Sequence, residues 1–219
     1  MRRENEQSIR LFRNAILESL SRVHPLVPLV VWVPLVMLLM ARAVMVHGLP
    51  ALGLVGIALA GLVAWTLTEY LLHRFVFHYP AKSRFGRWLV FLFHGVHHDA
   101  PRDRNRLVMP PAAAVLILAV LWFVFSLFIP HPWIEPFIAF FLVGYLVYDY
   151  IHFATHHFPM KHPVLRFIKH HHMQHHYASQ DGRYGVSSPL WDIVFGTYPK
   201  PSRASHSDGD SADSRKSGG

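Results

Sequence analysis

The sequence predicts an all-α integral membrane protein with four transmembrane helices in two hairpins and a cytosolic helical cap. Three observations support this fold class: four apolar runs of membrane-spanning length, a one-sided distribution of lysine and arginine, and two matched sets of histidines. The chain has 219 residues, of which 52% are hydrophobic and 16% charged. It has no cysteine, so disulfides, thiolate metal sites and cysteine nucleophiles are excluded.

Four apolar runs are long enough to cross a membrane as helices. They have 18 to 21 residues each, roughly 27–31 Å of helix, and cover residues 26–46, 49–68, 112–129 and 133–151. Very short connections at 48–50 and 130–132 join them in pairs, so each pair is predicted to form a hairpin. Pro28, Pro34 and Arg42 interrupt the first run, but transmembrane helices tolerate proline. A soluble protein with four buried core helices is the alternative, and these run lengths disfavour it.

Lysine and arginine lie on one side of these runs. The segment through Arg22 carries five, residues 74–106 carry seven, and the chain from Lys161 onward carries eight, whereas the two short connections carry none. Because cytosolic segments are enriched in these residues, both termini are predicted to be cytosolic. The membrane would be the inner membrane of a bacterium or the endoplasmic reticulum of a eukaryote. No nucleic-acid partner is needed to explain the net charge of +8, since the charge forms no stripe.

The chain divides into three parts. Residues 1–25 carry apolar side chains at helical spacing between charged ones, which predicts an amphipathic helix in the membrane interface or packed on the protein itself. No cleavable signal is expected there. Residues 26–199 form the membrane domain, in which the run 88–93 is expected to dip into the membrane surface. Residues 200–219 are rich in Ser, Gly and Asp and are predicted to be a disordered tail.

Ten of the 18 histidines repeat one plan in the two halves of the chain. Each half has a carboxylate, a spaced histidine pair and, 20 or 21 residues after the first histidine, the triplet H-x-x-H-H. In the first half these residues are Glu69, His73, His78, His94, His97 and His98. In the second half they are Asp149, His152, His156, His172, His175 and His176. The second and fourth runs are therefore predicted to deliver both halves to one site in the cap.

Helical geometry explains most of this spacing. Positions i, i+3 and i+4 share one face of an α-helix, so each triplet is expected to direct three imidazoles to one place. His152 and His156 are four residues apart and converge for the same reason. His73 and His78 are five apart, which an ideal α-helix splays by about 140°. A helix end or a local bulge is therefore expected at this pair.

Ten converging imidazoles predict a di-metal site. Neutral imidazole binds zinc, copper, iron and nickel, and ten ligands shared between two ions exceed the four of a closed structural zinc site. The pattern therefore favours open, redox-capable ions. Glu69 and Asp149 are predicted to accept hydrogen bonds from the outer ring nitrogens of the ligands. No metal role is assigned to the histidines outside the repeat, which are His24, His47, His131, His157, His162, His170, His171 and His206.

The order of these motifs resembles the fatty acid hydroxylase/sterol desaturase superfamily of membrane di-metal oxygenases. The resemblance covers roughly residues 50–198. Two stretches are similar to the fatty acid 2-hydroxylase branch in particular: Leu107–Pro111, which reads Leu-Val-Met-Pro-Pro, and Trp191–Tyr198, which contains Trp-Asp and Phe-Gly-Thr-Tyr. By this resemblance, residues 26–199 are a fatty acid hydroxylase membrane domain, and the ten histidines hold two iron ions, for which zinc can substitute in purified samples.

The resemblance implies a monooxygenase that uses O2 and external electrons to hydroxylate C2 of a long acyl chain of a fatty acid or sphingolipid. Fungal and animal members often carry an N-terminal cytochrome b5-type domain, for which residues 1–25 are too short. A separate electron donor is therefore expected, of the cytochrome b5, ferredoxin or reductase type. Arg102, Arg104 and Arg106 are predicted to hold a carboxylate or phosphate head group, with ordinary positive-inside charge as the alternative.

Three other functions remain open on the sequence. A carotenoid hydroxylase or a sterol methyl oxidase or desaturase would share the metal site and differ in the lipid that it oxidises. A membrane metal-ion transporter is the alternative of another class. Transporters place their ligands near the bilayer midplane, whereas these histidines follow the ends of the runs, so the transporter is disfavoured.

Overall fold

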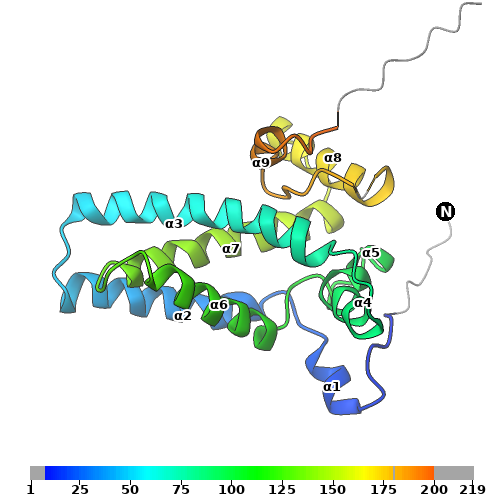
Figure 1. Cartoon of the computed structure of the whole chain (residues 1–219), viewed down its shortest axis with the longest axis horizontal. Coiled ribbons are helices and arrows are strands. Elements are labelled where there is room, and N and C mark those ends of the chain that lie inside the picture. Colours follow the sequence, from blue (N-terminus) through cyan, green and yellow to red (C-terminus); the bar gives the residue numbers. More distant parts are fainter. Residues whose placement is uncertain (1–7, 180, 200–219) are drawn as a thin grey trace, which may run out of the picture.

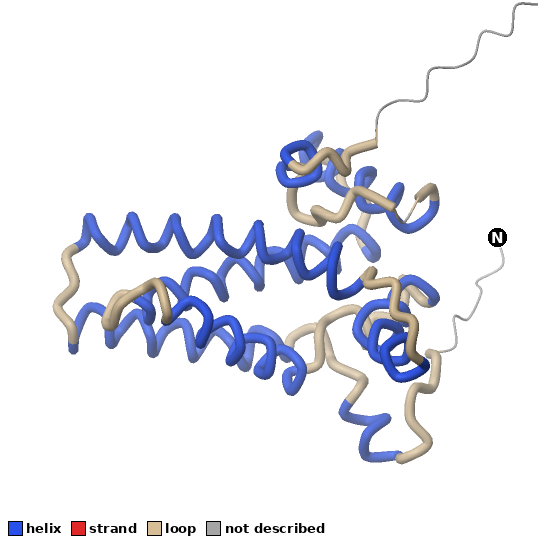
Figure 2. Tube along the Cα trace, in the orientation of Figure 1, coloured by secondary structure: helices blue, strands red, loops and turns tan. Residues whose placement is uncertain are grey.

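The computed structural model describes residues 8–179 and 181–199, and every regular element in this part of the chain is helical (Figure 1, Figure 2). The prediction of an all-α protein is confirmed. Long helices form two antiparallel hairpins that lie side by side, and shorter helices gather at one end of them (Figure 1). The predicted disordered tail, 200–219, lies outside the described residues.

The first hairpin consists of α2 (Val27–Ala41) and α3 (Ala51–Leu72). Each helix continues as a short π-helix, η1 (Arg42–Val46) after α2 and η2 (His73–Phe77) after α3. Pro28 lies in the first turn of α2, where a missing backbone N–H breaks no helical hydrogen bond. Gly48 follows η1 with a φ of +59°, a conformation that favours glycine. The predicted turn at 48–50 is thus built from residues suited to it.

The second hairpin consists of α6 (Pro111–Ser126) and α7 (Ile134–His157). Among the described residues, the segments long and apolar enough to cross a membrane are Val27–Val46, Ala51–Phe77 and Ile134–His157. α6 is apolar but has 16 residues, about 24 Å of helix, and falls short of that length. Length and composition therefore support three of the four predicted spans, and the third run, 112–129, forms a shorter helix.

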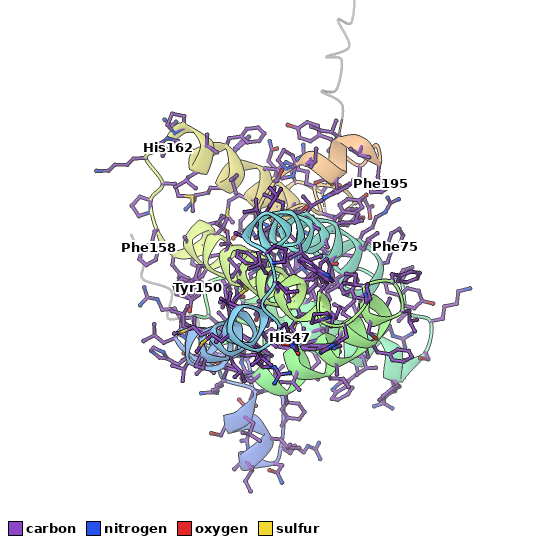
Figure 3. The ribbon with its side chains drawn as sticks, turned by 90° about the vertical axis from the view of Figure 1, so that its left-hand side faces the viewer. His47, Phe75, Tyr150, Phe158, His162 and Phe195 are labelled. Carbon is purple, nitrogen blue, oxygen red and sulfur yellow. The ribbon has the colours of Figure 1, made fainter. Side chains whose placement is uncertain are left out.

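The cap lies at the end of the hairpins where α3 and α7 finish (Figure 1). It contains α4 (Arg84–Val90), η3 (Phe91–Gly95) and α5 (Val96–Asp99), which follow one another without a break, and then α8 (Pro163–Tyr177) and α9 (Leu190–Val194). The short connections of both hairpins lie at the opposite end (Figure 1), which faces the viewer in Figure 3 and carries His47. The histidine-rich segments are therefore separated from the hairpin turns by the length of the bundle.

The N-terminal helix is shorter than the predicted amphipathic segment. Within residues 8–25, α1 covers only Ala15–Leu20, and the side chain of Asn14 caps it by accepting from the backbone N–H groups of Ile16 and Leu17. Ile16 is 71% exposed and Leu20 67% exposed. Their exposure leaves one apolar face of α1 uncovered by the protein.

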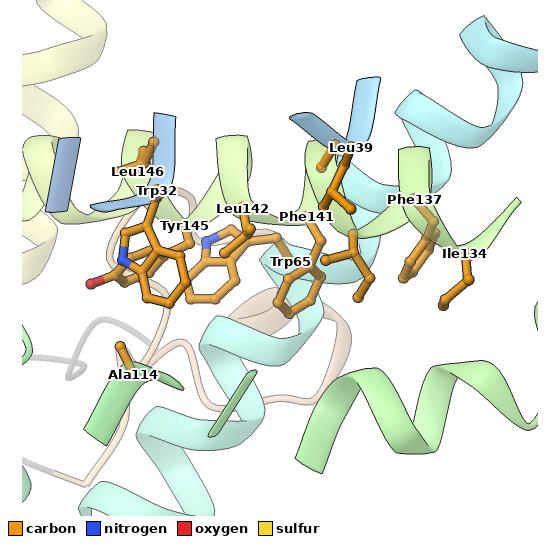
Figure 4. Packing of buried hydrophobic residues seen from close by; sticks show 12 residues of the cluster. Trp32, Leu39, Trp65, Ala114, Ile134, Phe137, Phe141, Leu142, Tyr145 and Leu146 are labelled. Carbon is orange, nitrogen blue, oxygen red and sulfur yellow. The ribbon is translucent and has the colours of Figure 1, made fainter. Parts of the chain in front are cut away.

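The core is centred on α7, which packs against α2 and α3 (Figure 4). Trp65 of α3 meets the edges of Phe141 and Tyr145, with ring centroids 5.2 Å away in both pairs. Close packing depends on glycine: a Cβ added at Gly61 would lie 2.5 Å from the carbonyl oxygen of Phe137. Small residues at such contacts let membrane helices approach closely. The α3–α7 contact fixes the two helices from which the first histidines of each half extend.

We predict that Gly61→Ala destabilises the protein by about 1–3 kcal/mol, because the added methyl group meets backbone atoms that cannot move without separating α3 from α7. Gly56→Ala is the matched control, since a Cβ at Gly56 has no heavy atom within 4 Å. Alanine at that position is expected to be neutral or stabilising by up to about 1 kcal/mol. Thermal unfolding of both variants in the same detergent measures the difference. Equal unfolding midpoints would contradict the close approach at Gly61.

Candidate metal centre

The π-helix η2 brings the first histidine pair together. The backbone N–H of His78 donates to the carbonyl oxygen of His73 at 3.1 Å, a hydrogen bond between residues five apart. The two Nε2 atoms lie 3.2 Å from each other. The bulge expected from the five-residue spacing is confirmed. A π-turn places residues i and i+5 above each other, which an ideal α-helix does not do.

The other histidines reach the same region from four further elements. His94, in η3, precedes His97 and His98, in α5. α7 contributes His152 and His156 near its C-terminal end, and α8 contributes the second triplet. Six of the ten are buried and the other four are partly buried, and His73, His172 and His175 are 3% exposed or less. All ten therefore meet between the ends of α3 and α7 and the cap.

The ten histidines form two groups of five, and in each group the ligand atoms lie within 4.8 Å of one another. The first histidine group is His73, His78, His94, His98 and His175. The second histidine group is His97, His152, His156, His172 and His176. The groups are neighbours, because the rings of His98 and His176 stack with centroids 4.2 Å apart. Each group could hold one metal ion.

The expectation that each triplet directs its three imidazoles to one place is wrong in detail. In the first triplet His94 and His98, four residues apart, join the first group, while His97 joins the second. The second triplet mirrors this: His172 and His176 join the second group and His175 crosses to the first. The physical reason is that the i+3 position is turned away from the i, i+4 pair and faces the neighbouring group. Each triplet therefore contributes ligands to both groups and connects them.

The distances within each group do not suit hydrogen bonding alone. Neighbouring Nε2 atoms lie 2.8–3.2 Å apart. His94 Nε2 is 3.0 Å from both His73 Nε2 and His98 Nε2. A ring nitrogen carries either one proton or one lone pair, so it cannot form both hydrogen bonds well. A cation at the centre of each group would accept all five lone pairs at once, which is how these residues fit a metal.

Burial keeps these imidazoles in the neutral form that binds metals. It lowers the pKa of His78 to about 4, with a further contribution from His175. Burial and the nearby His176 lower the pKa of His98 to about 2. For His176 the pKa falls to about 3, again through burial first and His156 second. The groups therefore present lone pairs at neutral pH.

Backbone carbonyls hold two rings of the first group by their outer nitrogens. His73 Nδ1 lies 2.5 Å from the carbonyl oxygen of Tyr184, and His175 Nδ1 lies 2.8 Å from that of Gly182. Both carbonyls belong to the loop after α8. Because a carbonyl only accepts, Nδ1 must carry the proton, and Nε2 is left free for a metal. The loop thus sets both the tautomer and the orientation of these rings.

Neither carboxylate of the repeat has the histidine partner that the sequence predicts. Glu69 accepts from the backbone N–H groups of Val186 and Ser187 at 2.6 and 2.8 Å, and from the Ser187 hydroxyl. It therefore anchors the loop and does not bond to a histidine ring. Asp149 is 2% exposed, and its Oδ2 has no hydrogen-bond partner among the described residues.

Asp192 is a site residue that the repeat does not reveal. Its carboxylate is fully buried and accepts from the backbone N–H groups of Tyr184 and Gly185, each at 2.8 Å. His171 Nε2 lies 3.3 Å away, and with these bonds it holds the pKa of Asp192 low despite burial. The sequence signal is the Trp-Asp stretch, which the resemblance singles out without giving it a role. Asp192 and Glu69 together hold four consecutive backbone N–H groups of the loop, those of residues 184–187.

The three arginines predicted to hold a head group differ in their surroundings. Arg106 is 6% exposed and donates to Glu18, at 2.5 Å, and to Ser21, at 3.0 Å. Its guanidinium fastens the N-terminal segment to the cap, so the prediction that it holds a lipid head group is not supported by its geometry. Arg102 and Arg104 are exposed.

An apolar cavity of about 330 Å³ leads to the histidines. Its walls come from the N-terminal segment, α3, α6 and α7, with Phe12, Leu118 and Phe141 among the lining residues. Its polar lining includes His94, from the first group, and His97 and His152, from the second. The cavity thus reaches both groups.

Comparison with known proteins shows the family to which this chain belongs. Residues 58–197 match the family model described as fatty acid hydroxylase, a range that includes all ten histidines. The chain belongs to the fatty acid hydroxylase family. The matched range begins within α3 and ends after α9, so it covers both histidine groups and the loop that orients His73 and His175.

Two relatives of this hydroxylase family member come from Arabidopsis thaliana, and both are dihydroceramide fatty acyl 2-hydroxylases. One is 38% identical over 87% of this chain and 80% of its own length, and the other is 41% identical over 78% and 71%. The fatty acid 2-hydroxylase of Rattus norvegicus is 36% identical, and the chain spans 56% of its length. A solved structure of Scs7p, in which only the hydroxylase domain is visible, aligns with a TM-score of 0.81 at 37% identity, covering 87% of this chain and 72% of that one.

We predict that the metal-free hydroxylase becomes less stable toward unfolding as the pH is lowered below the pKa of an unfolded histidine. An unfolded histidine has a pKa of about 6.5, whereas burial lowers those of His78, His98 and His176 to about 4, 2 and 3. Between these values the unfolded chain binds more protons, so stability is fully present above about pH 6.5 and is lost as the pH falls toward about 4. Thermal unfolding across this window measures it. An unfolding midpoint that stays constant from about pH 7 to about pH 5 would refute the buried neutral imidazoles.

We predict that Asp192→Asn weakens metal binding by about 10- to 100-fold, the usual effect of losing a group that orients ligands. The amide would turn a donor toward the N–H of Tyr184 or Gly185 and release the loop from His73 and His175. Asp181→Asn, an exposed acid of the same loop, is the control. Metal retained after dialysis against a chelator gives the comparison. Equal retention in both variants would show that Asp192 does not support the groups.

Proposed function

We propose that the chain is a membrane di-iron monooxygenase that hydroxylates C2 of a long acyl chain of a fatty acid or sphingolipid. The observation that carries this proposal is the pair of five-histidine groups, both of which contribute histidines to the lining of an apolar cavity. Relatives named dihydroceramide fatty acyl 2-hydroxylase and fatty acid 2-hydroxylase support the position of the reaction. The overall change is R–H + O2 + 2 electrons + 2 protons, giving R–OH + H2O.

The spacing of the ring nitrogens supports iron over a closed zinc site. With metal–nitrogen bonds of about 2.1 Å, ligands at right angles lie about 3.0 Å apart and tetrahedral ligands about 3.4 Å apart. The observed 2.8–3.2 Å fits right angles. Five ligands at right angles leave a sixth position open, as non-haem iron oxygenases need. Bound iron would supply the redox chemistry of O2, and zinc can replace it in purified samples.

The protein contributes a dry, shaped site next to these positions. The cavity walls are apolar along most of their length, so an acyl chain displaces no strongly bound water when it enters. His94, His97 and His152 line the cavity, and the C2 carbon of a bound chain would lie beside them. Holding that carbon in place is what selects one C–H bond among many similar ones.

The polar head of the lipid would remain at the cap. Arg102 and Arg104 are exposed and follow α5 directly, so they stay candidates for a carboxylate or phosphate contact. The cap and both termini are proposed to be cytosolic, because 20 of the 21 lysines and arginines belong to that side. The membrane is the inner membrane in a bacterium and the endoplasmic reticulum in a eukaryote. A separate cytochrome b5-like protein, ferredoxin or reductase would deliver the electrons at this face.

The alternatives fit the observations less well. A carotenoid hydroxylase or a sterol methyl oxidase or desaturase would use the same histidines, but the relatives reported above are named for acyl 2-hydroxylation. A metal-ion transporter would need ligands near the bilayer midplane. Both histidine groups instead combine residues at the C-terminal ends of α3 and α7 with residues of the cap.

The deciding experiment is expression in a host that lacks 2-hydroxy fatty acids, followed by mass spectrometry of hydrolysed lipids. With iron supplied, new 2-hydroxy acids are expected from the wild type. The double variant His97→Ala, His98→Ala removes one histidine from each group and is expected to form none. His162→Ala, an exposed histidine outside both groups, is the matched control and should retain activity.

Each result separates the candidates. A 2-hydroxy product in the wild type alone fixes the reaction, and the distribution between free acids and amide-linked acyl chains then identifies the lipid carrier. If the protein is folded, iron-loaded and reduced and yet no 2-hydroxy acid forms, hydroxylation at C2 is refuted. Sterols and carotenoids would then be the substrates to test.

A further inference from the structure

A third set of metal-ligand side chains lies at the opposite end of the bundle. His47, His131 and Glu135 place their ligand atoms within 4.8 Å of one another. We call this set the far-end triad. His47 follows η1 in the first short connection, His131 lies in the second, and Glu135 is in the first turn of α7. The sequence assigns His47 and His131 no metal role, because they lie outside the repeat.

We propose that the far-end triad binds one zinc ion and thereby joins the two hairpins at the membrane face opposite the histidine groups. Two imidazoles and one carboxylate are a ligand set that zinc uses in proteins, with water as the fourth ligand. The inference is independent of the hydroxylase activity, since none of the three residues lies in either histidine group.

The distances fit a tetrahedral ion. His47 Nε2 and His131 Nε2 each lie 3.5 Å from Glu135 Oε1. Tetrahedral ligands with bonds of about 2.1 Å are about 3.4 Å apart. This spacing is too long for a hydrogen bond and wider than the 2.8–3.2 Å spacing in the histidine groups. A zinc ion between these atoms would satisfy all three without a large movement.

Without an ion, one buried atom of the triad has no suitable partner. His47 Nε2 is buried and forms no hydrogen bond among the described residues. Such orphaned atoms are rare in folded proteins and call for an explanation. Glu135 has its own charged partner, because Arg42 donates two hydrogen bonds to it, of 2.9 and 3.0 Å.

Arg42 is compatible with a bound ion. Its Nη2 uses one lone pair of Oε1 and its Nε uses Oε2, so Oε1 keeps a second lone pair toward the histidines. Ligating carboxylates in metal sites are themselves hydrogen-bonded in this way. The side chain of Glu135 is 8% exposed and that of His131 is 64% exposed, so zinc can enter from the His131 side.

The test is the zinc content of the iron-loaded, full-length protein after equilibration with zinc and desalting. The wild type is expected to hold one zinc more per chain than His131→Ala or Glu135→Gln, and its unfolding midpoint should rise more with zinc than the midpoint of either variant. His162→Ala is the control for adventitious binding by surface histidines and should match the wild type. Zinc taken up by the histidine groups cancels in these differences.

Equal zinc content in the wild type and His131→Ala, with the same zinc-dependent shift of the midpoint in both, would overturn the proposal. Loss of one zinc in His162→Ala as well would overturn it too, because the uptake would then be unspecific. Glu135→Gln removes the partner of Arg42 and can impair folding. His131→Ala decides the case in that event, since its side chain is mostly exposed.

Discussion

The convergence of five ring nitrogens on one point, twice over, is the constraint on which the rest of this structure depends. A ring nitrogen that faces two others at 2.8–3.2 Å cannot form a good hydrogen bond with both, and burial keeps these imidazoles neutral. Such an arrangement is unfavourable unless a cation occupies each centre or the surrounding chain enforces it. The protein enforces it with elements far apart in sequence: two long helices, a short cap segment, α8 and a loop. Their packing can be understood as the means of holding ten rings in place.

The two histidine groups differ in how their ring orientations are held. In the first group, His73 and His175 are oriented by the carbonyls of Tyr184 and Gly182, and the loop that carries these carbonyls is held by Glu69 and Asp192. In the second group, the Nδ1 atoms of His97, His172 and His176 are buried without a hydrogen-bond partner among the described residues. Their orientation depends on helix packing alone. The loop therefore gives the first group a support that the second lacks.

The parts of this site that the sequence predicts are those set by local geometry. Helical spacing within α7 and the five-residue step from His73 to His78 are properties of a few consecutive residues, so the convergence of each pair and the bulge at η2 followed from them. The exchange of His97 and His175 between groups did not, because it depends on how α5 and α8 are rotated against each other. That rotation is set by contacts between segments some 79 residues apart, such as His97 with His176.

The same distinction explains the residues whose roles were mistaken. Glu69 lies one turn before His73, which made a ring nitrogen its expected partner, yet its carboxylate bonds to a loop 117 residues later. Arg106 counts as one more cation in a basic segment, and only the fold shows that Glu18 neutralises it. Both cases share a cause. A charged side chain can pair with any group of complementary charge or hydrogen-bonding capacity nearby, and for a buried side chain tertiary packing decides which group that is. Spacing predicts which residues can share a site, whereas packing decides which of them touch.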